Sequence, residues 1–455
     1  MTPNLPRRRA ERRGLRLAPV GTVLTLTFAT AIAVAAAVFF AGWDLLGAQG
    51  LKPERQLTSS TLFDLVKLSF GVVAGAGALV ALVVAYRRQR VDEDGALRDA
   101  TRLHTERFTT AVSQLGEESA AVRLGGVHAL AGLANDAPTR DLRQTCIDVL
   151  CAYLRLPYTA EADLPPGDAD ARHAYLAFRE VRHTVIRLIR DHLRLAPEHP
   201  HSWQGHDLDF TGVVFDGGDL SGAAFSGGTV DFSGAEFSGG TVTFSNARFS
   251  GGKVYFGGAQ FSGGQIEYSG ATFSGGTVYF NGAKFSGSRV RFSGAQFTGA
   301  TVHFDGAEFS GGSVYFSNAG FFDIGSWVSF SGGTVSFFGA EFTGSTVRFS
   351  GAGFTGATVH FDAAEFTGGT VHFSGAGFTG GTVHFSGAQF NGGTVSFFGA
   401  EFTGATVHFD EAEFTGGDVD FSSAEGTAPP GLLPSGRHPL PTGLSLPQAW
   451  YPPTP

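Results

Sequence analysis

The sequence predicts a transmembrane hairpin of two helices, a small α-helical neck and then a long all-β solenoid. Three observations support this prediction. Two long uncharged segments lie near the N-terminus, apolar residues then follow at helical spacing, and phenylalanines finally alternate five and seven residues apart. All but seven of the 44 phenylalanines lie between Phe210 and Phe421, and this range marks the repeating body.

Residues 18–43 and 68–86 are the predicted membrane spans. Each lacks charged residues and is long enough to cross about 30 Å of hydrocarbon. Arginines cluster before the first span and after the second, and such basic flanks stay cytoplasmic. We therefore expect an integral plasma-membrane protein with both termini and the solenoid in the cytoplasm. The flanking arginines are Arg7, Arg8, Arg9, Arg12, Arg13 and Arg16, then Arg87, Arg88 and Arg90.

Gly71 and Gly75 form a GxxxG motif on the second span, which is typical of a helix-packing face. We expect this face to pack against the alanine-rich first span. Homo-oligomerisation through the same face is the alternative.

Residues 87–200 are predicted to form the helical neck, and residues 1–17 a basic cytoplasmic N-terminus. Apolar residues recur at helical spacing from about Val91 to Leu156, and Pro138 separates two segments that we expect to pair antiparallel. One more helix is expected from about Arg172 to Leu195. Four neck histidines do not converge as metal ligands would, so we expect them to be satisfied or on the surface. They are His128, His173, His183 and His192.

Two cysteines, Cys146 and Cys151, lie five residues apart in the neck. This spacing turns them away from each other on a helix, so no disulfide is expected. We interpret them as buried thiols in a reducing compartment.

The repeating body spans residues 206–425 and consists of pentads with a central phenylalanine, such as "VVFDG" and "AAFSG". After Phe225 the pattern becomes two pentads plus two residues, as in "VDFSG AEFSG GT". The alternation "V-x-F" and "A-x-F" places both apolar residues on one side of a short strand. Glycine provides turn conformations at the corners. A coil of 24 residues has room for the rings, and about nine such coils at ~4.8 Å give a rod of roughly 45 Å.

The pentads and three segments of the neck resemble membrane-anchored pentapeptide-repeat proteins of actinobacterial type. The three segments are "TERFTTAVSQLG", "AVRLGGVHALAGLA" and "EVRHTVIRLI". The resemblance implies a right-handed, quadrilateral β-helix behind a HEAT-like neck. With so few helices, a full solenoid of HEAT type is not expected in the neck.

Two segments depart from the repeat. Between Phe321 and Phe337 the spacing breaks, which indicates a bulge or kink, or a recognition loop that carries Phe322 and Trp327. Residues 426–455 are rich in proline and are predicted to be a disordered, partly polyproline-II tail. An inert tail or an end cap is favoured there over docking to a partner's aromatic groove.

No catalytic, cofactor or metal residues are predicted, because no triad, phosphate loop or zinc spacing occurs. With 24-residue coils, His360, His384 and His408 should share one face at about 5 Å per coil. Such a ladder could bind metal or sense pH, but copying of repeats alone would also produce it. His303 and His372 occupy equivalent positions. A threonine column is attributed to strand propensity. Its members are Thr334, Thr346, Thr358, Thr370, Thr382, Thr394 and Thr406.

The charge balance of the two halves of the chain helps to decide between the candidate functions. Residues 1–205 have a balance of +4 and residues 206–425 a balance of −14, within an overall net charge of −9. An acidic body argues against direct nucleic-acid binding. We expect a non-catalytic, membrane-tethered scaffold that binds an unknown protein partner. The alternative is an acidic DNA mimic that acts on DNA gyrase or another DNA-binding protein. Candidate contact residues are Tyr255, Tyr279, Tyr315, Phe338 and Phe398.

Overall fold

The computed structural model describes residues 20–45, 58–159, 161, 164–316, 328–432 and 440–451. Contacts within the chain divide it into two compact units, residues 1–102 and 103–455. The arginines 7–16 and the loop 46–57 lie outside the described residues.

The first unit contains helix α1 (Val20–Leu45) and most of helix α2 (Ser59–Leu115). Among the described residues, α2 is the one helix that is long and apolar enough to cross a membrane, while the apolar stretch of α1 spans only Phe28–Ala37. The predicted hairpin of two spans is therefore not shown. A Cβ added at Gly71 or Gly75 would meet no described atom within 4 Å, so the predicted packing of this motif against the first segment is not observed.

In the second unit the neck consists of the end of α2 and helices α3 (Ala120–Asn135), α4 (Arg140–Leu154) and α5 (Ala169–Arg194). Thr139 and Asp168 cap α4 and α5 by accepting hydrogen bonds from backbone N–H groups. Helix α3 packs against both α4 and α5.

The cysteines behave as predicted, since both are free and buried inside the neck. Burial raises the pKa of Cys146 to about 11 and that of Cys151 to about 12. Both thiols therefore stay protonated at neutral pH and are unreactive.

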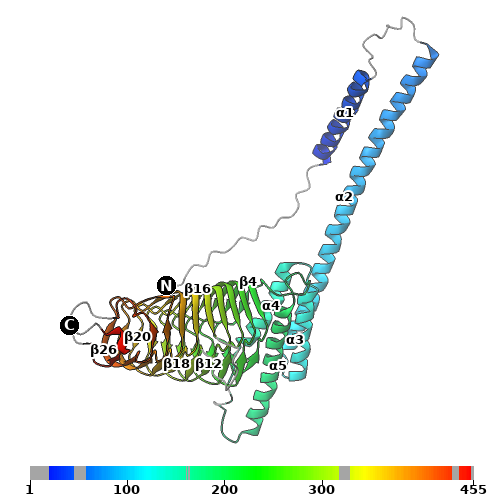
Figure 1. Ribbon diagram of the computed structural model, residues 1–455. Helices are drawn as coiled ribbons and strands as arrows, with labels where there is room; N and C mark the ends of the chain where they lie inside the picture. Colours follow the sequence, from blue (N-terminus) through cyan, green and yellow to red (C-terminus); the bar gives the residue numbers. More distant parts are fainter. Residues whose placement is uncertain are drawn as a thin grey trace, which may run out of the picture. The chain divides into compact units, whose positions relative to one another are not determined.

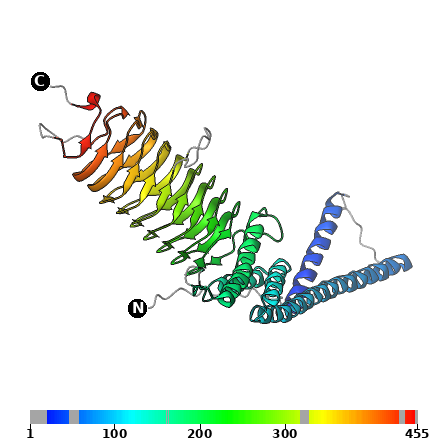
Figure 2. The same ribbon diagram turned by 90° about the horizontal axis from the view of Figure 1, so that it is seen from below.

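The solenoid follows the neck and is made of parallel strands (Figures 1 and 2). The eight-residue strands are β4 (Ala224–Asp231), β7 (Arg248–Tyr255), β10 (Thr272–Tyr279), β13 (Gln296–His303), β16 (Ser329–Ser336), β19 (Gly353–His360), β22 (Gly377–His384), β23 (Gln389–Ser396) and β26 (Glu413–Asp420). The three-residue strands are β6 (Thr241–Thr243), β9 (Gln265–Glu267), β12 (Arg289–Arg291), β15 (Ser313–Tyr315), β18 (Thr346–Arg348), β21 (Thr370–His372) and β25 (Thr406–His408). The two-residue strands are β1 (Leu208–Asp209), β2 (Val214–Phe215), β3 (Gly218–Asp219), β5 (Glu236–Phe237), β8 (Gln260–Phe261), β11 (Lys284–Phe285), β14 (Glu308–Phe309), β17 (Glu341–Phe342), β20 (Glu365–Phe366), β24 (Glu401–Phe402), β27 (Glu425–Gly426) and β28 (Leu444–Ser445).

The strand register confirms a coil of 24 residues. Phe273 pairs with Phe249 on one neighbour and with Phe297 on the other, which is a step of 24 in each direction. The solenoid completes about nine turns. Each coil contributes four paired segments, which we number as sides 1 to 4. In the coil that begins at Arg248, these are residues 248–249, 253–255, 260–261 and 265–267. The right-handed sense of the coil stays a prediction.

The core is made of stacked phenylalanines, as the spacing predicts. Phe256 and Phe280 stack with centroids 4.6 Å apart and rings 4° from parallel. The valines and alanines two residues before each ring are also buried. Burial of one such ring stabilises the fold by about 2 kcal/mol or more.

Glycine serves two kinds of corner. At the two-residue corner, a Cβ on Gly380 would lie 2.4 Å from the carbonyl oxygen of Thr355 in the preceding coil. At the corner inside the repeat, Gly234 has positive φ, but a Cβ would meet open space. Asn246 and Ala363 adopt positive φ at this second corner. Only the first corner therefore requires glycine for close approach of two backbones.

The break in the repeat is an insertion that leaves the core intact. Gln296 pairs with Ser329, a step of 33 residues and thus nine more than a normal coil. The ring stacks continue through the break, with 4.7 Å between Phe316 and Phe349 and 4.8 Å between Phe297 and Phe330. Residues 317–327, including Phe322 and Trp327, lie outside the described residues.

The C-terminal segment differs from the predicted disordered tail, because part of it caps the last coil. Strand β28 pairs with β26, and Trp450 is only 6% exposed. The Trp450 indole Nε1 donates a 2.9 Å hydrogen bond to the carbonyl oxygen of Gly426, and its ring meets those of Phe402 and Phe421 at 5.6 and 5.8 Å. The end of a solenoid exposes rings and an unpaired strand edge, which this segment covers.

Candidate functional site: the outward columns of the solenoid

The residues on either side of each buried phenylalanine point outward and form columns along the solenoid. A column takes one residue from each coil at a spacing of about 4.8 Å. On side 2, the residue before the phenylalanine forms what we call the histidine column. Its members are Tyr255, Tyr279, His303, Ser336, His360, His384 and His408.

The predicted histidine ladder is confirmed for His360, His384 and His408. Their rings stack with centroids 4.9 and 5.2 Å apart. His360 and His408 each lie beside an aspartate two residues on, at 2.8 Å from Asp362 and 3.2 Å from Asp410. Burial foremost lowers the pKa of His384, whose own repeat has Ser386 in place of the aspartate. His384 is therefore neutral at pH 7.

Stacking makes the ladder a poor metal site. Rings that lie face to face direct their nitrogens outward side by side, whereas metal ligands must converge on one point. Within the described ranges, no group of three His, Cys, Asp or Glu side chains could hold a metal ion.

His303 and His372 lie away from this stack. His303 stacks on Tyr279 at 5.2 Å and contacts Asp305, while Ser336 separates it from His360. His372 lies on side 4, where it pairs with Arg348 and Ser396.

The threonines form two columns on different sides, whereas the sequence suggested one. This follows from the coil length, because residues twelve apart lie half a turn from each other. Side 2 carries Thr334, Thr358, Thr382 and Thr406, and side 4 carries Thr346, Thr370 and Thr394.

Carboxylates gather on side 3 and on the corner that leads to it. Glu308, Glu341 and Glu365 are neighbours in register, and Lys284 neutralises only the first of them, at 3.1 Å. Asp305 and Asp362 lie on the adjoining corner, after the phenylalanines of side 2. This edge therefore carries most of the negative charge of the middle coils.

Two exposed aromatic rings interrupt the polar columns. Phe338 and Phe398 are 56% and 52% exposed, unlike every other described phenylalanine of the solenoid. They belong to near-identical segments 60 residues apart, which is two and a half coils, so they lie on opposite edges. The predicted contact tyrosines are half-buried, and Tyr255 stacks on Tyr279 at 4.9 Å.

The neck closes the other end of the solenoid with a polar network that the sequence did not reveal. Asp216, which is 7% exposed, accepts hydrogen bonds from the hydroxyls of Tyr158 (2.5 Å) and Tyr175 (2.6 Å). Arg179 and His183 of α5 lie 3.3 and 3.5 Å from the same carboxylate. Burial acts to raise the pKa of Asp216, but the hydrogen bonds of His183, Tyr158 and Tyr175 hold it well below its usual range.

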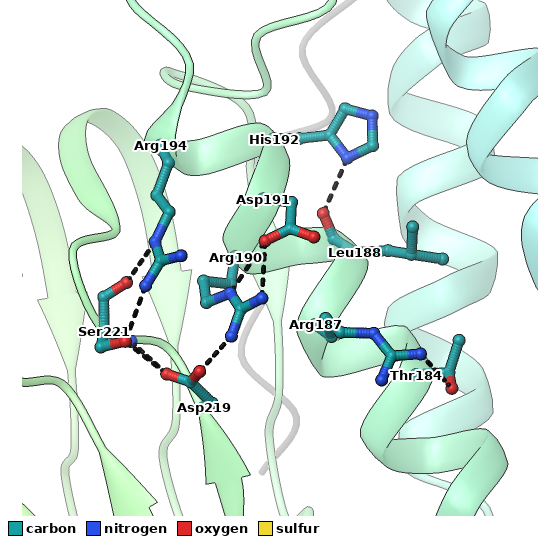
Figure 3. Close-up of polar contacts among 9 residues, drawn as sticks. All are labelled: Thr184, Arg187, Leu188, Arg190, Asp191, His192, Arg194, Asp219 and Ser221. Carbon is teal, nitrogen blue, oxygen red and sulfur yellow. Dashed lines mark hydrogen bonds and ion pairs between the residues drawn. The ribbon is translucent and has the colours of Figure 1, made fainter.

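Helix α5 adds further contacts along the first coil (Figure 3). Arg190 forms an ion pair with Asp219 of β3, and Arg194 donates hydrogen bonds to the backbone and side-chain oxygens of Ser221 at 2.6 and 2.7 Å. His192 stacks on Trp203 at 4.1 Å, and its Nδ1 lies 2.7 Å from the carbonyl oxygen of Leu188. The other two of the four histidines considered in the sequence analysis, His128 and His173, are exposed.

Comparison with known proteins supports the repeat assignment. Residues 210–260 and 256–302 match the family model of pentapeptide repeats (9 copies). A search of curated proteins found no significant match to the chain. Solenoids of pentapeptide repeats are typically non-enzymatic structural or interaction proteins, and nothing in the described structure indicates catalysis.

Proposed function

We propose that this chain is a non-catalytic scaffold, tethered to the plasma membrane, whose cytoplasmic solenoid binds protein partners through its outward columns. The observation that carries this proposal is the division of the repeat into an apolar interior and continuous outer columns. All core positions are filled by stacked rings and small side chains, so binding falls to the exterior. Phe338 and Phe398 are exposed rings of the kind enriched at protein interfaces.

Membrane tethering rests on the uncharged segments 18–43 and 68–86 and their arginine flanks. The apolar part of α2 supports one span. A membrane-impermeant lysine reagent applied to intact cells tests the topology. Lys52 and Lys67 should be modified, whereas Lys253 and Lys284 should be protected, and modification of the solenoid lysines would refute a cytoplasmic solenoid.

Proximity labelling in the native host, with the labelling enzyme at the C-terminus, tests the scaffold itself. Enrichment of a defined set of proteins over a control that carries only residues 1–90 supports the proposal. No enrichment over this control would contradict it.

A DNA mimic is the second candidate, favoured by the acidic edge around Glu341 and Glu365. The amount of negative charge argues against a DNA mimic, because about 45 Å of duplex carries roughly 26 phosphate charges at one per ~1.7 Å. The solenoid has a balance of only −14. Enrichment of gyrase subunits in the labelling experiment would favour this candidate.

A further inference from the structure

Basic residues are rare in the solenoid, and half of them lie on one side of it. Residues 206–425 contain six basic side chains against 20 acidic ones. Three of the six, Arg289, Arg291 and Arg348, lie on side 4 within three successive coils. Chance scattering over four sides and nine coils would separate them.

The register brings these arginines around one tyrosine. Arg291 pairs with Tyr315 in the next coil, and Tyr315 pairs with Arg348 in the coil after that. The Arg348 guanidinium lies over the Tyr315 ring, 5.2 Å from its centroid. Arg289 lies two residues before Arg291 on the same strand and pairs with Ser313 in the next coil.

Two of the three arginines have no carboxylate partner within the described part of the chain. Arg291 forms an ion pair with Glu267 and a 3.1 Å hydrogen bond with the Gln265 amide oxygen. No such pair is found for Arg289 or Arg348 among the described residues. The outward residues of side 4 from β12 to β21 include no acid at all. They are Arg289, Arg291, Ser313, Tyr315, Thr346, Arg348, Thr370 and His372.

The pKa of the Tyr315 phenol responds to the neighbouring hydroxyl and to the arginine charges. A hydrogen bond with Ser313 foremost lowers the pKa of Tyr315, burial opposes this, and the charges of Arg348 and Arg289 lower it further. The positive charges of Arg289 and Arg348 therefore both favour the ionised form of this phenol.

We propose that Arg289, Tyr315 and Arg348, which we call the arginine patch, bind an acidic segment of a partner protein. Guanidinium groups bind carboxylates with paired hydrogen bonds, and the phenol adds a donor between them. A short peptide fits better than a nucleic acid, because the balance of −14 on the solenoid repels a long polyanion. The inference rests on the proposed scaffold function and specifies the chemistry of one partner.

Binding of a fluorescein-labelled dodecamer of alternating Asp and Gly to the full-length protein in detergent, measured by anisotropy, tests the patch. The double variant Arg289→Gln/Arg348→Gln removes both free guanidiniums. The control Arg248→Gln/Lys253→Gln removes the same number of charges from β7, where both side chains are exposed. We expect the first to weaken binding about tenfold and the control by less than about twofold. Tyr315→Phe, which removes only the hydroxyl, should weaken binding by an intermediate factor.

Equal weakening by both double variants would mean diffuse charge attraction and would overturn the proposal, as would unchanged binding in the patch variant. Tighter binding of a single-stranded DNA dodecamer at the patch would replace the acidic peptide by a nucleic acid. Circular dichroism of each variant checks that the fold is retained. Patch-dependent peptide binding without any labelled partner in cells would refute the scaffold and leave the patch. The reverse result, partners retained in cells by the patch variant and no peptide binding, would refute the patch and leave the scaffold.

Discussion

Tyr268 occupies a core position that phenylalanine fills in the neighbouring coils. Its ring stacks between Phe244 and Phe292 at 4.9 and 4.7 Å, so its hydroxyl is fully buried with no hydrogen-bond partner among the described residues. Burial raises the pKa of Tyr268 well above its usual value. An unsatisfied buried hydroxyl costs about 1–3 kcal/mol.

We therefore predict that Tyr268→Phe stabilises the middle coils by about 1–3 kcal/mol. Amide hydrogen exchange of strands β6, β9 and β12 gives the local opening free energy. Tyr255→Phe, on the outer surface, is the matched control and should change it by less than about 0.5 kcal/mol. A loss of protection in the Tyr268→Phe protein would show that the hydroxyl has a partner.

The two kinds of corner glycine lead to a second prediction at the same scale. Gly380→Ala forces a Cβ to 2.4 Å from the Thr355 carbonyl oxygen, whereas Gly234→Ala meets open space. Gly234→Ala bears only the cost of positive φ, roughly 1–2 kcal/mol. Gly380→Ala must instead separate the backbones of two coils, so we expect it to lower the thermal midpoint more. Equal midpoints for the two variants would contradict the close-approach argument.

At the scale of elements, the joint between α5 and the first coil depends on the ionised Asp216. Because its pKa is depressed in the folded state, its contribution is present above the unfolded value of about 3.9 and is lost as pH falls below it. We predict that hydrogen-exchange protection of β2 and of residues 175–183 of α5 declines below about pH 4.

The variant Asp216→Asn should weaken the joint at pH 7 by about 1.5–3 kcal/mol and flatten its acid dependence. Asp219→Asn is the control, because the Arg190–Asp219 pair is partly exposed to solvent and contributes less. An unchanged acid transition in the Asp216→Asn protein would assign the pH dependence to other carboxylates.

The coils were predictable from the sequence, whereas the joint was not, and the cap was only one of two favoured alternatives for the tail. Phenylalanine spacing is a local signal, and it determines coil length, core and the stack of His360, His384 and His408. Asp216 meets Tyr158 and Tyr175 across 58 and 41 residues of chain, and no local pattern reports such a contact. The arginine patch likewise cannot be recognised until the register brings Arg289, Tyr315 and Arg348 together.

At the scale of the whole molecule, the solenoid has two ends, and the rings and strand edges at each end must be covered. Helices α4 and α5 cover the first coil, and the C-terminal segment covers the last (Figure 1). The proline-rich composition left an inert tail and an end cap as alternatives, and a few buried apolar residues form the cap. They are Leu432, Leu444, Leu446 and Trp450.

Trp450 is the residue on which this cap depends most. Trp450→Ala removes the ring that covers Phe402 and Phe421 and the hydrogen bond to Gly426. Loss of a buried tryptophan costs about 3–5 kcal/mol, which exceeds what the two-residue pairing of β28 can supply, so the cap should open.

The opened end presents rings and an unpaired parallel edge, and such edges associate with one another. We therefore expect faster amide exchange in β26 and concentration-dependent oligomers in light scattering. Tyr451→Ala, whose side chain is 46% exposed, should leave both unchanged. A monomeric Trp450→Ala protein with full protection of β26 would mean that the last coil is stable without its cap.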